Sequence, residues 1–118
     1  MRAKDILGRL GEEAAADHVS GLGWTIIDRN WRCAEGELDI VAKDGPDIVV
    51  CEVKTRSSTD FGTPAEAVTA AKATRLRRLA DRWLAAHGVR HAAVRIDIIG
   101  LVGNGGGRFS VDHHRGVC

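Results

Sequence analysis

Apolar and polar positions along the chain follow two periods, one of two residues and one typical of helices. Runs with a period of two predict strands, and apolar positions at helical spacing predict helices. The predicted strands cover Trp24–Arg29, two segments within residues 36–56, Val94–Val102 and, more weakly, Arg108–His114. The predicted helices cover about Ala3–Ser20 and about Pro64–His87. The order α-β-β-β-α-β(-β) predicts an α/β domain whose mixed sheet of four to five strands is flanked by two main helices.

The segment from residue 36 to residue 56 reads G-E-L-D-I-V-A-K-D-G-P-D-I-V-V-C-E-V-K-T-R, two apolar runs joined by a turn signal. The residues Asp44–Asp47 predict a hairpin loop between two antiparallel strands. Continuing this register away from the loop puts Asp39 opposite Glu52. Two residues further on, it puts Glu37 opposite Lys54. The hairpin therefore carries three acids and one lysine at matched positions.

Strand side chains alternate between two faces, so these four groups are expected on one face of the hairpin. The other face is expected to be apolar and to consist of Leu38, Ile40, Ala42, Val49, Cys51 and Val53. A register shifted by one residue would exchange the faces. We therefore expect one face of the hairpin to be core and the other to carry a cluster of charge.

Two carboxylates facing each other across a ladder lie about 4.5–5.5 Å apart at Cβ and repel unless a cation lies between them. A divalent ion such as Mg²⁺ would relieve that repulsion, since it takes carboxylate, water and phosphate oxygens as ligands. Lys54, two residues after Glu52, would then lie beside the metal and stabilise phosphate charge or orient a water. The alternative is a solvent-facing hairpin in which Glu37 simply pairs with Lys54.

The first predicted helix presents two adjacent glutamates, of which only one can point inward. Glu12 lies with the apolar positions Ala15 and Val19, whereas Glu13 falls on the polar side. Glu12 is therefore a candidate for a third acidic ligand or for a contact to a metal-bound water. The alternative is an interfacial glutamate that pairs with Lys54 or with an arginine.

The D…E-x-K residues Asp39, Glu52 and Lys54 resemble the core of the PD-(D/E)XK nuclease superfamily. With G-R-L-G-E-E near the start, N-W-R before the hairpin and F-G-x-P-x-E-A-V at Phe61–Val68, the chain resembles the YraN-like family of bacterial proteins from about Leu7 to about Ile99. The resemblance implies a restriction-endonuclease-like fold similar to archaeal Holliday junction resolvases. In those nucleases a glutamate of the first helix assists the metal, and Glu12 matches it.

The activity that the resemblance implies is metal-dependent endonuclease cleavage of DNA, including branched DNA. Asp39 and Glu52, with Glu12 assisting, would hold Mg²⁺ or Mn²⁺ at the scissile phosphate, and Lys54 would complete the catalytic set. The alternative is a non-catalytic module that binds nucleic acid or a partner on the same scaffold, and a third reading is a structural protein whose hairpin charges set strand register. By analogy with the resolvases, a symmetric homodimer is a further expectation.

A basic segment within the second predicted helix suggests where nucleic acid would bind. Lys72 lies on the apolar stripe with Leu76, so it must either extend outward or face a polar site. The residues expected to contact nucleic acid are Arg32, Thr55, Arg56, Lys72, Arg75 and Arg78. The alternative for the arginines is a solvated helix face, and Trp31 either stacks on nucleic acid or closes the core beneath the hairpin.

Composition agrees with one small domain over residues 1–118, because 44% hydrophobic residues suffice for a single core. A net charge of +1 excludes a uniformly basic coat for DNA but allows a local basic surface. Three cysteines without a C-x-x-C pair argue against a disulfide framework and a zinc knuckle. The N-terminus lacks a long apolar stretch, so we expect no signal peptide, no membrane span and a cytoplasmic location.

Three polar residues near the C-terminus are expected to lie outside the site. Asp97 either supports the site from a neighbouring strand or, as we favour, is an edge-strand carboxylate. His113 and His114 are adjacent in a strand and so point to opposite faces, which argues against a metal pair. We expect both histidines to face solvent.

Overall fold

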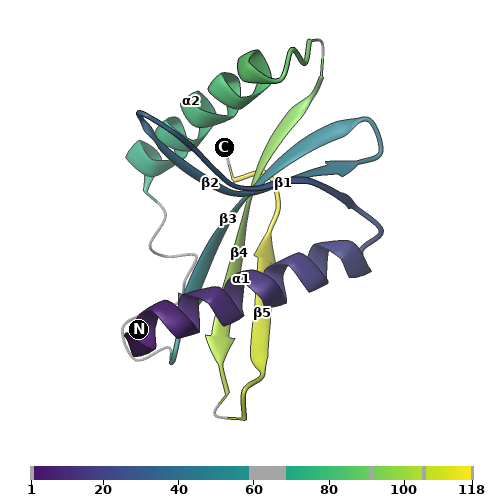
Figure 1. Ribbon diagram of the computed structural model, residues 1–118. Coiled ribbons are helices and arrows are strands. Elements are labelled where there is room, and N and C mark those ends of the chain that lie inside the picture. Colours follow the sequence, from purple (N-terminus) through teal and green to yellow (C-terminus); the bar gives the residue numbers. More distant parts are fainter. Residues whose placement is uncertain (1, 59–68, 91, 105, 118) are drawn as a thin grey trace.

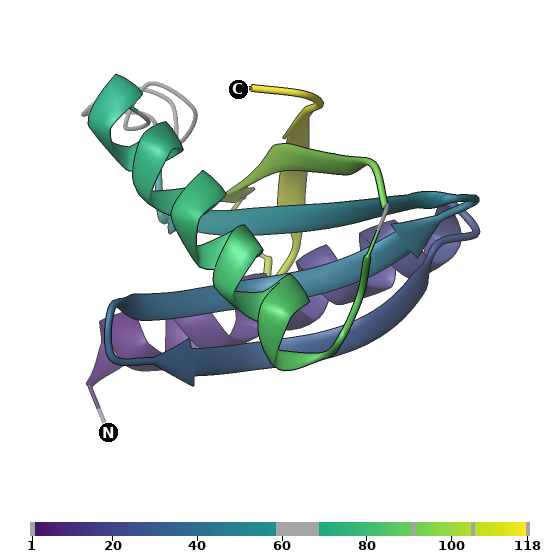
Figure 2. The same ribbon diagram turned by 90° about the horizontal axis from the view of Figure 1, so that it is seen from above.

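A mixed sheet lies between two helices, one on each face, as Figures 1 and 2 show in a computed structural model. The structure describes residues 2–58, 69–90, 92–104 and 106–117. Its elements are α1 (Ala3–Gly21), β1 (Thr25–Cys33), β2 (Gly36–Asp44), β3 (Asp47–Arg56), α2 (Ala70–Ala86), β4 (Val94–Gly103) and β5 (Phe109–His114). The predicted α/β class, the order of elements and the two flanking helices are confirmed.

The five strands lie in the sheet in chain order, from β1 to β5. Neighbouring strands are antiparallel except for β3 and β4, which are parallel. Parallel neighbours need a crossover connection, and α2 forms part of it. This crossover places α2 on one face of the sheet while α1 covers the other (Figure 2).

Each face of the sheet carries its own hydrophobic cluster. The cluster under α1 consists of Ala15, Ala16, Val19, Trp24, Ile40, Ala42, Val49, Cys51, Ile99 and Leu101. The cluster under α2 consists of Leu38, Val41, Ile48, Val50, Leu76, Leu79, Ala80, Trp83, Ile96 and Ile98. The central strands β3 and β4 are thus apolar on both faces, as expected for strands covered by helices on both sides.

The prediction that Leu38 lies on the apolar hairpin face with Ile40 is wrong, and the face with the cluster of charge is not polar along its whole length. Val41 and Val50 share the face of Asp39 and Glu52, but they are buried under α2. Leu38 also packs on the α2 side and not with Ile40. The backbone pairing of β2 with β3 ends at Ile40 and Cys51, and the part of β2 before Ile40 pairs with β1 alone, so its side chains need not follow the faces of the hairpin. The face is therefore apolar at one end and charged at the other.

Several element boundaries differ from the predicted ones. β1 extends to Cys33, four residues beyond the predicted end, with an irregularity between Ile26 and Asp28. α2 begins at Ala70, where the hydroxyl of Thr69 accepts a hydrogen bond from the Lys72 amide at 3.2 Å. The predicted helix start at Pro64 and the F-G-x-P segment lie outside the described residues.

Asp97 and His113 are placed differently from what the sequence suggests, and Trp31 takes one of its two expected places. Trp31 packs against the cluster under α2, which supports its core reading. Asp97 is not an edge residue: β4 lies between β3 and β5, and the side chain is fully buried. The side chain of His113 is only 9% exposed, with its Nε2 atom 2.8 Å from Asp97 Oδ2, so the prediction that it faces solvent is wrong, whereas His114 is exposed as expected.

Of the helices in the described ranges, neither has the length and apolar character needed to cross a membrane.

Candidate functional site

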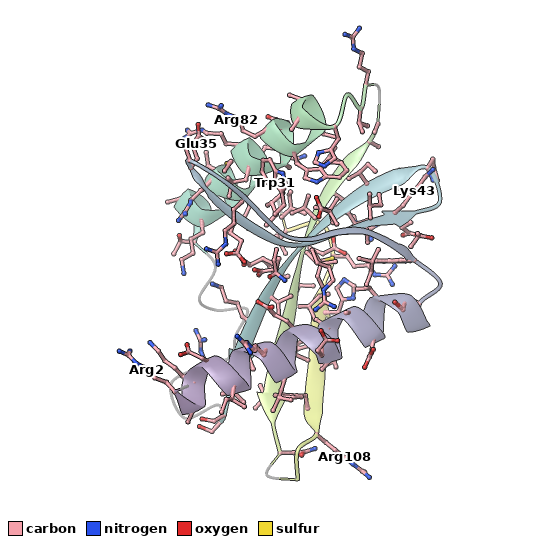
Figure 3. All side chains as sticks on the ribbon, viewed as in Figure 1. Arg2, Trp31, Glu35, Lys43, Arg82 and Arg108 are labelled. Atoms are coloured by element: carbon pink, nitrogen blue, oxygen red, sulfur yellow. The ribbon has the colours of Figure 1, made fainter. Side chains whose placement is uncertain are left out.

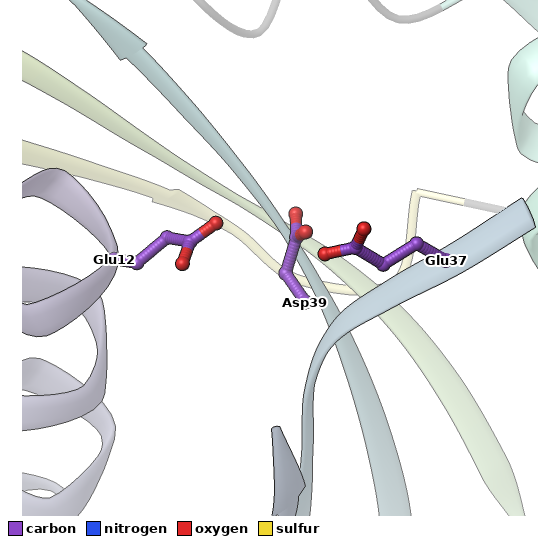
Figure 4. Close-up of side chains that lie close together, drawn as sticks. All are labelled: Glu12, Glu37 and Asp39. Atoms are coloured by element: carbon purple, nitrogen blue, oxygen red, sulfur yellow. The ribbon is translucent and has the colours of Figure 1, made fainter. Parts of the chain in front are cut away.

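Three carboxylates from α1 and β2 converge beside the end of the hairpin ladder (Figure 4). One oxygen from each of Glu12, Glu37 and Asp39 lies within 4.8 Å of the other two. All three residues are half-buried. Glu12 comes from α1, which packs over one face of the sheet. Glu37 and Asp39 come from β2, where their spacing of two residues puts them on the same side of the strand. We call these three residues the acidic cluster.

Asp39 occupies the position where the backbone pairing of β2 and β3 stops. Its Oδ2 atom accepts a hydrogen bond of 2.8 Å from the backbone amide of Val53. The Glu52 carboxyl, its predicted partner across the ladder, is close enough to raise the pKa of Asp39. The predicted register holds from Lys43 and Ile48 to Ile40 and Cys51, and beyond this last pair the side chain of Asp39 takes the place of a backbone acceptor.

The electrostatics of the cluster favour protonation in the absence of a cation. Burial, followed by the neighbouring Glu52, raises the pKa of Asp39, although the Val53 amide and Lys54 oppose the change. Burial and the charges of Asp39 and Glu37 likewise raise the pKa of Glu12. Mutual repulsion among half-buried carboxylates is the condition that a divalent cation relieves.

Glu37 is the member of the acidic cluster that the sequence interpretation did not assign to the metal site. We expected it opposite Lys54, but its Oε2 atom lies 3.1 Å from Nε of Arg32. Its spacing of two residues from Asp39 was the available signal. In the sequence that spacing indicates a shared strand face, but it does not by itself indicate metal ligation.

A cleft of about 230 Å³ opens from the acidic cluster toward α2. It is lined by Glu37, Asp39, Glu52, Lys54, Lys72, Arg75, Leu76 and Leu79. Asp39, Glu52 and Lys54, proposed from the D…E-x-K pattern, therefore line one cleft. No ion pair joins the Lys54 ammonium to another group among the described residues, which leaves it available to an anion in the cleft.

Two of the predicted nucleic-acid residues on α2 reach this cleft, and one does not. Lys72 and Arg75 line it, and Arg75 Nη2 also donates to the carbonyl of Glu35 at 3.3 Å. Arg78 is exposed elsewhere on α2. The β1–β2 turn is held against α2 by an ion pair of Glu35 with Arg82, both labelled in Figure 3.

The predicted contacts at the end of β3 have different surroundings. Thr55 is half-buried, and its side chain lies against α1 where Gly11 leaves room for it. Arg56 is exposed, and its Nη1 atom donates to the Thr55 carbonyl at 3.2 Å. Arg32 is exposed on β1 and, with Glu37, lines one cleft beside α1 and another beside Arg75 of α2. The structure thus places Thr55 in helix–sheet packing and leaves Arg56 and Arg32 accessible.

Oxygen-rich, half-buried and repelling carboxylates match the ligands that hard divalent ions prefer. Glu12, Glu37 and Asp39 fit such an ion by donor type and by mutual distance, and Glu52 adjoins them through Asp39. A neighbouring lysine and two further cations in the same cleft provide charge suited to a phosphate. The arrangement can therefore bring a divalent ion and a phosphate ester together.

Comparisons with known proteins give one consistent match. A family model described as uncharacterised protein family UPF0102 matches residues 11–101. A UPF0102 protein of Frankia alni is 56% identical over 117 residues, covering 99% of this chain and 98% of its own. A UPF0102 protein of Arthrobacter sp. (strain FB24) is 52% identical over 117 residues, covering 99% of each chain. One of Kineococcus radiotolerans is 50% identical over 118 residues, covering 99% of this chain and 97% of its own.

Proposed function

The chain belongs to the uncharacterised protein family UPF0102, the YraN family that its sequence resembles, and we propose that it acts as a divalent-metal-dependent endonuclease on DNA. The observation that carries the proposal is the shared cleft of Asp39, Glu52 and Lys54, next to the acidic cluster. In this proposal the D…E-x-K residues act as they do in the PD-(D/E)XK nucleases.

The residues that would hold Mg²⁺ or Mn²⁺ are Asp39, Glu52 and Glu12, to which the structure adds Glu37. When bound, such an ion neutralises charge on the scissile phosphate and lowers the pKa of a water molecule. These four carboxylates come from three elements, α1, β2 and β3. Their relative positions therefore depend on how α1 packs against the β2–β3 hairpin. The Val53 amide fixes Asp39 through its hydrogen bond.

Lys54 would act on the phosphate directly. Its ammonium lines the cleft with Asp39 and Glu52 and is free to contact a phosphate oxygen. There it would stabilise the additional negative charge of the transition state or orient the attacking water. Because β3 continues beyond the last backbone pair with β2, the lysine projects into the cleft from a strand that β4 still supports.

Lys72 and Arg75 would position the DNA backbone from the other wall of the same cleft. Both residues belong to α2, so a strand lying in the cleft would contact a helix on one side and the sheet on the other. Contacts of this kind fix register on the nucleic acid without reading its sequence. Arg56 on β3 and Arg78 on α2 are exposed and lie close in sequence to Lys54 and Arg75, respectively. They would extend the contact to longer substrates.

The experiment that tests the proposal uses end-labelled linear and branched DNA with Mg²⁺, Mn²⁺ or EDTA. Products that form only with a metal ion support the endonuclease and show which DNA shape it prefers. Binding of DNA without cleavage in either metal would instead support the non-catalytic module. Size measurements of the protein with a four-way junction would test the symmetric dimer, because a junction offers two equivalent strands.

A further inference from the structure

A second and larger cleft, of about 760 Å³, lies on the other side of the acidic cluster. The first half of α1 forms one wall, and β1 with the start of β2 forms the other. Its lining includes Lys4, Gly8, Arg9, Arg29, Arg32 and Glu37. Glu37 lines both clefts, so the two meet at the acidic cluster.

Ion pairs leave two cations of this cleft without a partner. Arg29 Nη2 lies 2.8 Å from Glu13 Oε1, and Arg32 is paired with Glu37. Lys4 and Arg9 are exposed on α1, and neither forms an ion pair or a side-chain hydrogen bond within the described part of the chain. With Asp5, an exposed acid in the same lining, they leave the outer part of the cleft with two cations against one acid.

Gly8 lies in the same wall and has no packing reason to be glycine. A glycine inside a helix is destabilising relative to alanine. A Cβ atom at Gly11 would lie 2.1 Å from Thr55 Oγ1, so close packing requires that glycine. A Cβ atom at Gly8 would meet nothing within 4 Å. The bare surface at Gly8 instead keeps the wall of the cleft open between Lys4 and Glu12.

We propose that this second cleft is a phosphate-binding subsite for the nucleic-acid strand, in which Lys4 and Arg9 contact backbone phosphates and Gly8 allows the strand to approach α1. The strand then passes from Lys72 and Arg75 across the acidic cluster to Lys4 and Arg9. This subsite rests on the proposed function, because it extends the same substrate beyond the scissile phosphate. The subsite would explain Gly8 and Arg9, the G-R of the G-R-L-G-E-E motif, which have no part in the acidic cluster.

Binding of labelled DNA to an Asp39→Asn protein tests the subsite without turnover. Adding Lys4→Ala and Arg9→Ala together is expected to weaken binding about tenfold at low salt, and to reduce the slope of log K against log salt by about 1.5 to 2. The matched controls are Lys43→Ala at the hairpin tip and Arg108→Ala before β5, two residues labelled in Figure 3 that do not line the cleft. They are expected to leave affinity and slope nearly unchanged.

Substitutions of Gly8 separate folding from binding. Gly8→Ala is expected to raise the melting temperature, because it adds a methyl group in open space. Gly8→Leu is expected to stay folded and to weaken DNA binding, because its side chain fills the cleft. Normal binding by Gly8→Leu would contradict the close approach of the strand.

The outcomes distinguish this subsite from the proposed nuclease activity. Wild-type protein that binds DNA through Lys4 and Arg9 without cleaving it would overturn the nuclease and retain the subsite. Wild-type protein that cleaves DNA, with unchanged binding and salt slope in the double variant, would overturn the subsite alone. Absence of DNA binding by the wild type would overturn both.

Discussion

The carboxylate of Asp39 accepts a hydrogen bond from the backbone amide of Val53, with 2.8 Å between the two atoms. This bond lies just beyond Ile40 and Cys51, the last backbone pair of β2 with β3. The Asp39 side chain thus replaces a backbone acceptor at the point where the two strands stop pairing. The same bond holds the Asp39 carboxylate against Glu52 and gives the acidic cluster a fixed member.

Two substitutions of Asp39 are expected to affect stability differently in metal-free protein near neutral pH. Asp39→Asn keeps an oxygen that can accept from Val53 and is neutral without taking up a proton on folding, so the free energy of unfolding should rise. Asp39→Ala removes the acceptor as well, so it should be less stable than Asp39→Asn by about 1 kcal/mol. Urea unfolding measures both, and equal stability of the two variants would show that the Val53 bond contributes nothing.

The pH dependence of stability should report on Asp39. Burial, and then Glu52, raise its pKa from 3.8 to about 8, so the folded state binds this proton more tightly than the unfolded state. The resulting stabilisation is complete below about pH 4 and is lost as the pH rises toward about 8.

In EDTA, the melting temperature of the wild type should therefore fall between about pH 5 and about pH 8 relative to that of Asp39→Asn. Parallel curves for the two proteins would contradict a raised pKa at Asp39. Added Mg²⁺ should reduce the difference at the higher pH, because a bound cation offsets the repulsion of the ionised carboxylates.

Gly11 permits the close approach of α1 to Thr55. Gly11→Ala should destabilise the protein by about 1–3 kcal/mol, because the new methyl group would overlap the Thr55 side chain. Gly8→Ala is the matched control on the same helix, and it should stabilise by about 0.5–1 kcal/mol. Thr55→Ala should recover part of the loss when combined with Gly11→Ala. Failure of this rescue would place the strain elsewhere.

Asp97 depends on hydrogen bonds from three residues for its burial. Burial alone would raise its pKa, but the bonds from Arg95, His113 and the Gly116 amide outweigh that effect and hold the pKa below its usual range. Arg95→Ala would leave a buried charge without its partner and should cost about 3 kcal/mol. Arg108→Ala, at an exposed position, should cost under about 0.5 kcal/mol. Equal effects in thermal or urea unfolding would contradict a structural ion pair.

The hairpin is the part of the site that the sequence predicts best. The turn signal and the period of two predicted Asp39 beside Glu52, and they predicted the face that Lys54 shares with both. Local pattern suffices here because the turn sets the register of an antiparallel pair. The inward position of Glu12, which follows from helical spacing, is likewise present in the structure.

The remaining features depend on contacts that a local pattern does not contain. Leu38 changes face because β2 leaves β3 and stays with β1, and Glu37 consequently joins Asp39 and Arg32 instead of Lys54. His113 is largely covered because the tail returns to Asp97 and α1, where its Nδ1 atom lies 2.9 Å from Nε2 of His18. Period two predicts the face of a residue, but it does not predict which distant element covers that face.

Cleavage of end-labelled DNA in Mn²⁺ by the wild type, Asp39→Asn and Asp17→Asn tests the proposed nuclease most directly. Asp17 is an exposed acid on the polar side of α1, so its substitution is the matched control for loss of one negative charge. We expect the wild type and Asp17→Asn to produce the same products at similar rates, and folded Asp39→Asn to produce none. Equal cleavage by all three proteins would contradict a catalytic acidic cluster.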